Sequence, residues 1–304
     1  MKILITGSNG MLGRALCSVF AKDGSYNVTG LDLSRKPSPD IKDDFYETCD
    51  ITDTARLFKI VKQREPDLII HAAAFTDVDE CESNPDKAET VNGLGARCVA
   101  EAAVEINAGL IYISTDFVFD GEKRSPYTED DTPNPLGVYG SSKLNGEKSV
   151  EEIMENKRFF IIRTSWLFGE GGKNFIDAIL KKAKEEKKLR VVTDQFGSPT
   201  YTLDLAGAIM RMLSVYGKKD DIYGTYHITN SDDCSWYRLA QKALELARLY
   251  EVDLIPIVSE ELDRPAVRPA MSILDNRRYI KLFGEPLRRW DKALEEYIRL
   301  MRRR

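Results

Sequence analysis

Residues 1–16 read MKILITGSNGMLGRAL. The apolar run Lys2–Thr6 predicts a buried strand, and the apolar residues after residue 10 recur at helical spacing. Between these two patterns Gly7, Gly10 and Gly13 form a GxxGxxG turn. Such a turn lets the backbone approach a pyrophosphate, which then lies at a helix N-terminus where free N–H groups favour negative charge. The stretch therefore predicts a strand–turn–helix unit that binds a nucleotide.

Short apolar runs and helical patterns alternate beyond this unit, which is typical of a parallel α/β sheet. The predicted strands are Lys2–Thr6, Asn27–Leu31, Leu68–Ala72, Leu110–Ser114 and Phe159–Arg163. The predicted helices after the first are Thr54–Arg64, Lys87–Ile106, Val138–Asn156 and Phe175–Glu186. Because the strands are apolar throughout, helices should cover both faces of the sheet. The pattern predicts a doubly wound Rossmann sheet.

The periodic pattern loosens after about Thr164, where glycine- and proline-rich stretches separate shorter elements. We therefore expect two parts: residues 1–165 as the dinucleotide-binding sheet domain, and residues 166–304 mainly as a smaller C-terminal substrate-binding domain. Segments of this second part could interleave with the sheet. The stretch Asp120–Pro135, rich in Gly, Pro, Asp and Glu, is predicted to be a loop.

The composition excludes several classes of protein. The chain has 304 residues, of which 42% are hydrophobic and 31% charged, with a net charge of −5, five cysteines and two histidines. No run approaches the roughly 20 apolar residues that span a bilayer, and MKILITG does not resemble a secretory signal. Scattered cysteines indicate free thiols in a cytoplasmic protein. The acidic balance argues against nucleic-acid binding, and two histidines leave little room for histidine-based metal sites.

Asp32 follows the second predicted strand, where a carboxylate can accept hydrogen bonds from the adenosine ribose. This position favours NAD(H), because a carboxylate repels a 2′-phosphate. Arg14 and Arg35 are close enough in sequence to receive that phosphate. The sequence therefore permits either NADPH or NADH.

Tyr139 and Lys143 stand four residues apart in YGSSK, so that a helix would carry both on one face. A nearby ammonium stabilises a phenolate, and we expect Lys143 to lower the pKa of Tyr139 toward the working pH. Tyr139 could then protonate a carbonyl oxygen as hydride arrives. Thr115, at the end of the strand before this helix, could hydrogen-bond the same carbonyl or the tyrosine hydroxyl. The alternative for YxxxK alone is an ordinary surface tyrosine near a solvated lysine.

Together these residues resemble an extended short-chain dehydrogenase/reductase, and more narrowly the dTDP-4-dehydrorhamnose reductase family. The similarity covers nearly the whole chain. It depends most on AAAFTDVD (72–79), STDFVFDG (114–121) and RTSWLFG (163–169), supported by GSNGMLGRAL, CDITD, YGSSK, DQFGSPT and RPAMS. One residue of RPAMS, Met271, departs from the polar or aromatic residue often found before the serine.

The resemblance implies roles for individual residues. Tyr139 would donate the proton, Lys143 would tune it and contact the nicotinamide ribose, and Thr115 would hold the sugar carbonyl. Thr115, Asp116 and Trp166 would contact the sugar nucleotide, with Trp166 as an apolar wall. The residues expected to bind the cofactor are Gly7, Gly10, Met11, Leu12, Gly13, Asp32, Asp50, Ile51, Ala72, Ala73, Ala74, Tyr139 and Lys143.

The implied activity is NAD(P)H-dependent reduction of the C4 carbonyl of dTDP-4-dehydro-L-rhamnose to give dTDP-L-rhamnose. We expect a dTDP-sugar as the partner molecule, no nucleic acid or membrane, no metal, and a possible homodimer. Two alternatives stay open. A regulatory subunit of methionine adenosyltransferase resembles this family and binds a partner enzyme without turnover. A sugar-nucleotide epimerase, or a reductase of another sugar, shares the N-terminal motifs.

Overall fold

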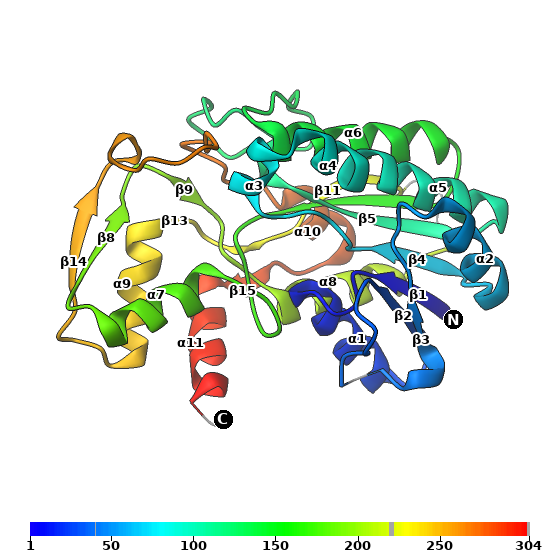
Figure 1. Cartoon of the computed structure of the whole chain (residues 1–304), viewed down its shortest axis with the longest axis horizontal. Coiled ribbons are helices and arrows are strands. Elements are labelled where there is room, and N and C mark those ends of the chain that lie inside the picture. The colour runs from blue at the N-terminus through cyan, green and yellow to red at the C-terminus, as the bar shows by residue number, and fades with distance from the viewer. Residues whose placement is uncertain (40, 219–221, 303–304) are drawn as a thin grey trace.

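The computed structural model describes residues 1–39, 41–218 and 222–302 and is built around one parallel sheet (Figure 1). The strand order is β11-β6-β5-β4-β1-β2-β3, and each neighbouring pair is parallel. The order reverses between β1 and β4, and such a reversal is where open α/β sheets bind their ligands. The strands are β1 (Lys2–Thr6), β2 (Asn27–Asp32), β3 (Tyr46–Thr48), β4 (Leu68–His71), β5 (Gly109–Thr115), β6 (Phe159–Thr164) and β11 (Gly224–His227).

The predicted doubly wound sheet is confirmed, and the five predicted strands agree with β1, β2, β4, β5 and β6 to within one residue at each end. Two strands of the sheet were not among those predicted. The three residues of β3 are only half-buried, and their sequence, YET, contains no apolar run that would predict a strand. The four residues of β11 come from the second half of the chain and pair with β6 at the sheet edge.

Helices cover both faces of the sheet and enclose two apolar cores. One face packs against α1 (Met11–Asp23), α8 (Thr202–Leu213) and α10 (Arg277–Phe283). The other packs against α2 (Thr54–Arg64), α5 (Gly95–Glu105) and α6 (Val138–Ile153). The single helix predicted over Lys87–Ile106 is instead α4 (Pro85–Ala88), a π-helical segment η2 (Glu89–Leu94) and α5. A short helix, α3 (Val78–Ser83), precedes α4.

A third core belongs to the cap, which lies at the left in Figure 1. Its helices are α7 (Phe175–Glu185), α9 (Trp236–Ala247) and α11 (Trp290–Met301), beside the parallel pair β8 (Lys188–Val192) and β14 (Asp253–Ile257). Shorter strand pairs complete it: β7 (Leu167–Phe168) with β10 (Thr200–Tyr201), β9 (Phe196–Gly197) with β13 (Cys234–Ser235), and β12 (Asn230–Ser231) with β15 (Leu287–Arg289). The helix α8 packs on the sheet, and β11 is its edge strand. The second half of the chain therefore contributes to the sheet domain as well as to the cap. The boundary between residues 165 and 166 stays a prediction.

Both histidines lie in the sheet and are buried. Burial lowers the pKa of His71 and of His227 to about 3, assisted by Lys143 and Arg163 respectively. Each imidazole is therefore neutral at pH 7. All five cysteines are free thiols. Within the described ranges no helix is long and apolar enough to cross a membrane.

A substitution in the first turn of α1 can test how closely the glycine loop packs against the helix. A Cβ on Gly13 would overlap the Gly7 carbonyl oxygen and lie 2.7 Å from the Ser8 Cα. We expect Gly13→Ala to lower the free energy of unfolding by about 1–3 kcal/mol, because backbone atoms cannot move aside as a side chain could. Urea denaturation would measure the loss. The matched control is Gly207→Ala in α8, where a Cβ meets nothing within 4 Å and should stabilise the helix by up to about 1 kcal/mol. Equal effects of the two changes would contradict this packing.

Candidate active site

The glycine loop places its backbone against the end of β4. Gly7 has φ +67°, and a Cβ on it would lie 2.7 Å from the Cα of Ala73. The Gly10 N–H donates to the Gly7 carbonyl at 2.9 Å, which closes the turn. Gly10 is the exposed N-cap residue of α1, and no side chain caps this end of the helix. The open N–H groups and the positive end of the helix dipole suit a pyrophosphate.

Around this loop lie the other residues predicted to bind a cofactor. Ala72, Ala73 and Ala74 are half-buried just after β4, and the Ala72 N–H donates to the Thr6 carbonyl at 3.2 Å. In the first turn of α1, Met11 is half-buried and Leu12 is buried. Small residues beside a glycine turn leave room for a flat ligand to approach the backbone.

Asp32 ends β2 on the same edge of the sheet. Its carboxylate accepts hydrogen bonds from the Asn9 N–H at 3.0 Å and the Ser34 N–H at 3.2 Å, which fix it beside the glycine loop. The Cys49 N–H donates to the Asp32 carbonyl at 3.0 Å, so Asp50 and Ile51 follow directly. Asp50 is exposed, whereas Ile51 is buried.

The two candidate arginines for a 2′-phosphate differ in environment. The Arg14 Nε donates to the Asn9 carbonyl at 2.9 Å, and its side chain lies against Gly171. Arg35 is exposed after β2. With Asp32 and both arginines at one edge, the arrangement accommodates either dinucleotide.

Tyr139 and Lys143 lie in the first two turns of α6, but not with the predicted electrostatics. Lys143 is buried; its ammonium donates to the Ile113 carbonyl at 2.7 Å and lies 4.0 Å from the centre of the Tyr112 ring. Burial raises the pKa of Tyr139, opposed by the Thr115 hydroxyl and assisted by Asp116 and Cys81. The expectation that Lys143 lowers this pKa is therefore wrong, because the Lys143 ammonium turns toward β5.

Two groups predicted to contact a substrate lie at the end of β5: Thr115 is its last residue and Asp116 follows it. Thr115 is buried, and its hydroxyl donates to the Asp116 carboxylate at 3.1 Å. Burial raises the pKa of Asp116 to about 7, although hydrogen bonds from the Ser272 and Thr115 hydroxyls oppose the shift. Asp116 therefore lies close to its protonation midpoint at neutral pH.

Trp166 follows β6 with φ +46°, a backbone conformation that few non-glycine residues adopt. Its indole stacks on that of Trp236, with ring centroids 3.6 Å apart and planes 7° from parallel. The edge of the Trp166 ring packs closely on Gly197. The Trp166 ring is therefore held in place by its packing against Trp236 and Gly197 of the cap. Trp236 was not predicted, because residues 70 apart in sequence carry no sign of this stack.

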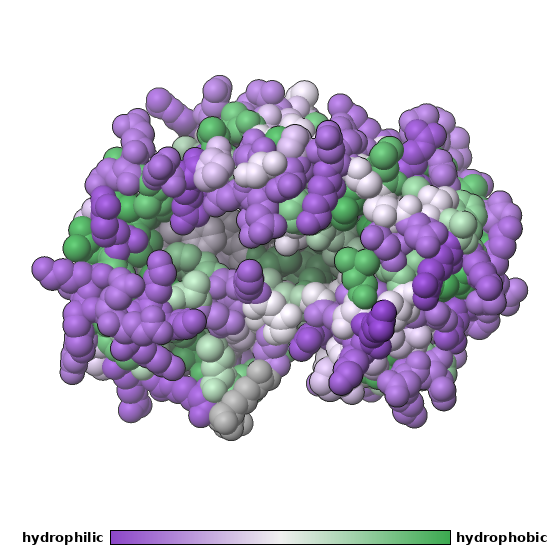
Figure 2. Space-filling view, in the orientation of Figure 1, coloured by the Kyte–Doolittle hydropathy of each residue, from purple (hydrophilic) through white to green (hydrophobic). Residues whose placement is uncertain are grey.

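The segment RPAMS connects the cap to the end of β5. Arg268 pairs with Asp79 at 2.9 Å, and Phe196 exchanges backbone hydrogen bonds of 2.8 Å with Ala270 and Ser272. Met271, the departure noted in the sequence, forms a β-bridge with Phe196. In Figure 2 a hollow lies between the sheet domain and the cap, with apolar and neutral residues in its depth below a polar rim.

Acidic side chains in the segment after β4 accept hydrogen bonds from backbone N–H groups at the starts of two helices. Asp77 caps α3 by accepting the Glu80 N–H at 3.2 Å, and Glu82 accepts the Val138 N–H at 2.7 Å at the start of α6. Within the described part of the chain, no group of three or more His, Cys, Asp or Glu side chains is arranged to hold a metal ion.

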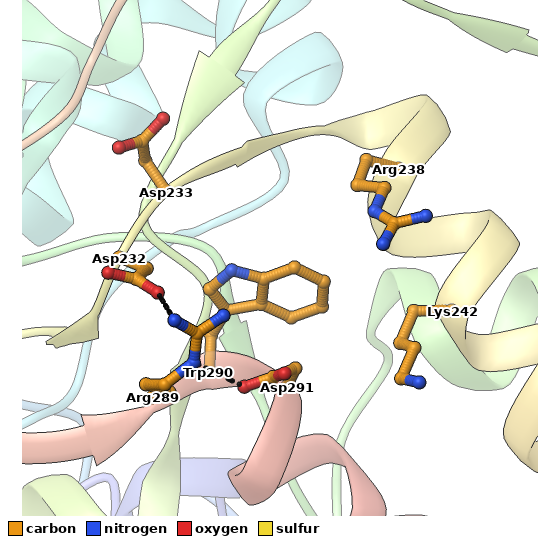
Figure 3. A pocket seen from close by; sticks show the side chains of 7 residues that line it. All are labelled: Asp232, Asp233, Arg238, Lys242, Arg289, Trp290 and Asp291. Carbon is orange, nitrogen blue, oxygen red and sulfur yellow. Dashed lines mark hydrogen bonds and ion pairs between the residues drawn. The ribbon is translucent and has the colours of Figure 1, made fainter.

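A separate pocket of about 260 Å³ lies in the cap (Figure 3). Among its charged residues, Arg289 pairs with Asp232 at 2.6 Å and with Asp291 at 3.2 Å. It contains none of the predicted site residues. The end of the sheet, not this pocket, is therefore the candidate active site.

Comparison with known proteins agrees with this location. The family model described as RmlD substrate binding domain matches residues 1–303. The spore coat polysaccharide biosynthesis protein SpsK of Bacillus subtilis is 39% identical over 297 residues, covering 98% of this chain and 96% of that protein. A crystal structure of a dTDP-4-dehydrorhamnose reductase from Clostridium acetobutylicum has a TM-score of 0.89 and 37% identity, covering 99% of this chain and 100% of that one. The structure of dTDP-4-dehydrorhamnose reductase from Bacillus anthracis in complex with NADP has a TM-score of 0.88 and 35% identity, covering 98% and 99%.

The place of Asp32 leads to a test with the free cofactors. Asp32→Ala removes the carboxylate expected to meet the ribose hydroxyls, and a charge-assisted hydrogen bond is worth about 1.5–3 kcal/mol. We expect the dissociation constant for NADH to rise roughly tenfold or more, and that for NADPH to rise less, because repulsion of its 2′-phosphate is removed as well. Fluorescence titration measures both. Asp23→Ala, at the exposed end of α1, is the matched control. Unchanged NADH affinity in Asp32→Ala would contradict the assignment.

Proposed function

The chain belongs to the RmlD substrate binding domain family, and we propose that it reduces the C4 carbonyl of dTDP-4-dehydro-L-rhamnose with NADPH or NADH, giving dTDP-L-rhamnose. The observation that carries this proposal is one assembly at the carboxyl edge of the sheet. Tyr139, Lys143 and Thr115 lie there on neighbouring elements, on the same edge as the Gly7–Gly13 loop. Relatives named dTDP-4-dehydrorhamnose reductase, one of them in complex with NADP, support the substrate and the cofactor.

Tyr139 is suited to donate a proton. The phenol is protonated at neutral pH, so a proton is available when negative charge develops on a carbonyl oxygen; burial, which raises its pKa, makes it a weaker acid that needs a partner for the phenolate. A bound reduced nicotinamide supplies the hydride for the carbonyl carbon. The Thr115 hydroxyl, which interacts with Tyr139, orients the phenol and can donate to the same oxygen. For Lys143 to stabilise the phenolate left behind, its ammonium would have to turn from the Ile113 carbonyl toward Tyr139, and we assign it this role during the reaction.

The remaining predicted residues have roles in binding. We assign the pyrophosphate to the backbone around Gly7, Gly10 and Gly13 with Met11 and Leu12, the adenosine ribose to Asp32, and the adenine to Asp50 and Ile51. Ala72, Ala73 and Ala74 would lie beneath the cofactor. Asp116, buried directly after β5, can accept a hydrogen bond from a sugar hydroxyl. Trp166, stacked on Trp236, would pack its ring on the deoxyhexose.

The two alternatives are less well supported. Relatives named as reductases match 96–99% of the chain at 37–38% identity, which favours turnover over a purely regulatory subunit. An epimerase returns the hydride to its sugar and consumes no NADPH at steady state, whereas the proposed reaction consumes one NADPH per sugar. The homodimer and the cytoplasmic location stay predictions.

Removing the Tyr139 hydroxyl tests the proposed proton donor. The wild-type protein should oxidise NADPH when the dTDP-4-keto-sugar is added, followed by absorbance at 340 nm. Tyr139→Phe should lower kcat by about 10²–10⁴-fold, the usual contribution of a general acid, while the NADPH dissociation constant stays within about twofold. Tyr250→Phe, at a side chain in the cap that is 75% exposed, is the matched control and should keep full activity. Undiminished turnover in Tyr139→Phe would overturn the assignment.

A further inference from the structure

The buried face of α6 carries a third ionisable residue that the proposed reaction does not use. Tyr139, Lys143 and Glu147 follow one another at four-residue spacing, so they line one face of the helix, which packs over β5 (Figure 1). Glu147 is only 1% exposed and Lys143 2%. A carboxylate so deeply buried is costly unless it is paired and hydrogen-bonded.

Glu147 has a full set of partners. The Arg163 Nε donates to its Oε1 at 3.0 Å, and a terminal Arg163 nitrogen donates to Oε2 at 2.7 Å. The Ser114 hydroxyl donates to Oε1 as well, at very short range. Arg163 lies on β6 and is 4% exposed. This fork holds the carboxylate in one position.

The same face of α6 contacts three successive residues of β5. Lys143 donates to the Ile113 carbonyl, Glu147 accepts from the Ser114 hydroxyl, and Tyr139 interacts with the Thr115 hydroxyl. The position of Lys143 relative to Tyr139 is therefore tied to the position of Glu147. A shift of the helix along the strand would break all three contacts.

Burial opposes the charge of Lys143, whereas the Ile113 carbonyl, the Tyr112 ring and Glu147 favour it. Burial lowers the pKa of Lys143 to about 7, and Glu147 raises it in opposition. His71, on β4, is neutral and carries no compensating charge. The ionisable groups facing this region are Tyr139, Glu147 and Glu151 on α6, Tyr112 on β5, His71 on β4, Arg163 on β6, Asp116 after β5, Cys81 on α3 and Glu89 on η2.

We propose that Glu147, held by Arg163 and Ser114, is a positioning residue that keeps the buried Lys143 ammonium charged and in place against β5, one helical turn from Tyr139. This proposal rests on the function proposed above only for the consequence of that charge. The link between Glu147 and Lys143 itself can be measured in the protein without cofactor or substrate.

The test separates the charge of Glu147 from its shape. Glu147→Gln keeps the length of the side chain and loses its charge, whereas Glu147→Asp keeps the charge and shortens the side chain. The titration of Lys143 is followed in each by NMR of protein labelled with ¹³C-lysine, with the resonance assigned by its absence in Lys143→Met. We expect a midpoint near pH 7 in the wild type and a midpoint lower by about one pH unit or more in Glu147→Gln. Glu147→Asp should restore most of the wild-type midpoint.

Two further variants guard against a loss of stability. Glu147→Gln leaves Arg163 as an unpaired buried cation, so the double variant Glu147→Gln/Arg163→Gln removes both charges and should also titrate below the wild type. Asp204→Asn removes a partner of Arg288 in the cap, where their atoms lie 2.8 Å apart, and should leave Lys143 unchanged. A wild-type midpoint in both Glu147 variants that lack the charge would overturn the proposal.

The activity measurement then addresses the proposed function separately. The basic limb of kcat/KM for the keto-sugar should move to lower pH in Glu147→Gln by the same amount as the Lys143 midpoint. A midpoint that shifts without the limb would contradict the role proposed for Lys143 in catalysis and leave its link to Glu147 intact. A merely structural role for Glu147 would change the melting temperature and neither titration.

Discussion

The close packing of α6 against β5 is the constraint on which the active site depends. It brings the phenol of Tyr139 to the end of the strand and buries Lys143 against the Ile113 carbonyl. A Cβ on Gly146 would overlap the Tyr112 hydroxyl of β5 and lie 2.5 Å from the Asn92 carbonyl of η2, so the helix can approach this closely only with glycine there. The close fit excludes water, and this exclusion raises the pKa of Tyr139 and lowers that of Lys143.

The cap is joined to this arrangement by the chain itself. The segment Arg268–Ser272 leaves the cap, pairs with Asp79 and reaches the carboxylate of Asp116. Trp236 supports Trp166 from the other side. The substrate contacts proposed at the end of β5 and on the cap are therefore held in place by the same set of packed segments. The hollow in Figure 2 lies between the sheet domain and the cap.

Much of this arrangement could be predicted from local patterns. The strand–glycine–helix unit, the acid after β2 and the spacing of Tyr139 and Lys143 each depend on neighbours in sequence, and the structure places all of them at one edge of the sheet. The strand β11 could not be predicted with the sheet, because its four residues acquire their place only by pairing with β6. The prediction that Lys143 lowers the pKa of Tyr139 was wrong for a similar reason. Spacing shows that two side chains share a helix face, but the direction of the ammonium depends on the Ile113 carbonyl and the Tyr112 ring, which belong to another element.

The central claim is that the chain transfers hydride from a nicotinamide to the C4 carbon of a dTDP-keto-sugar. The most direct test is to supply NADPH deuterated at the transferred position of nicotinamide C4 and to analyse the sugar product by mass spectrometry and NMR. The account predicts one deuterium per product molecule, bound to C4 of the rhamnose ring. A product without deuterium, or no product with any dTDP-4-keto-sugar, would contradict it.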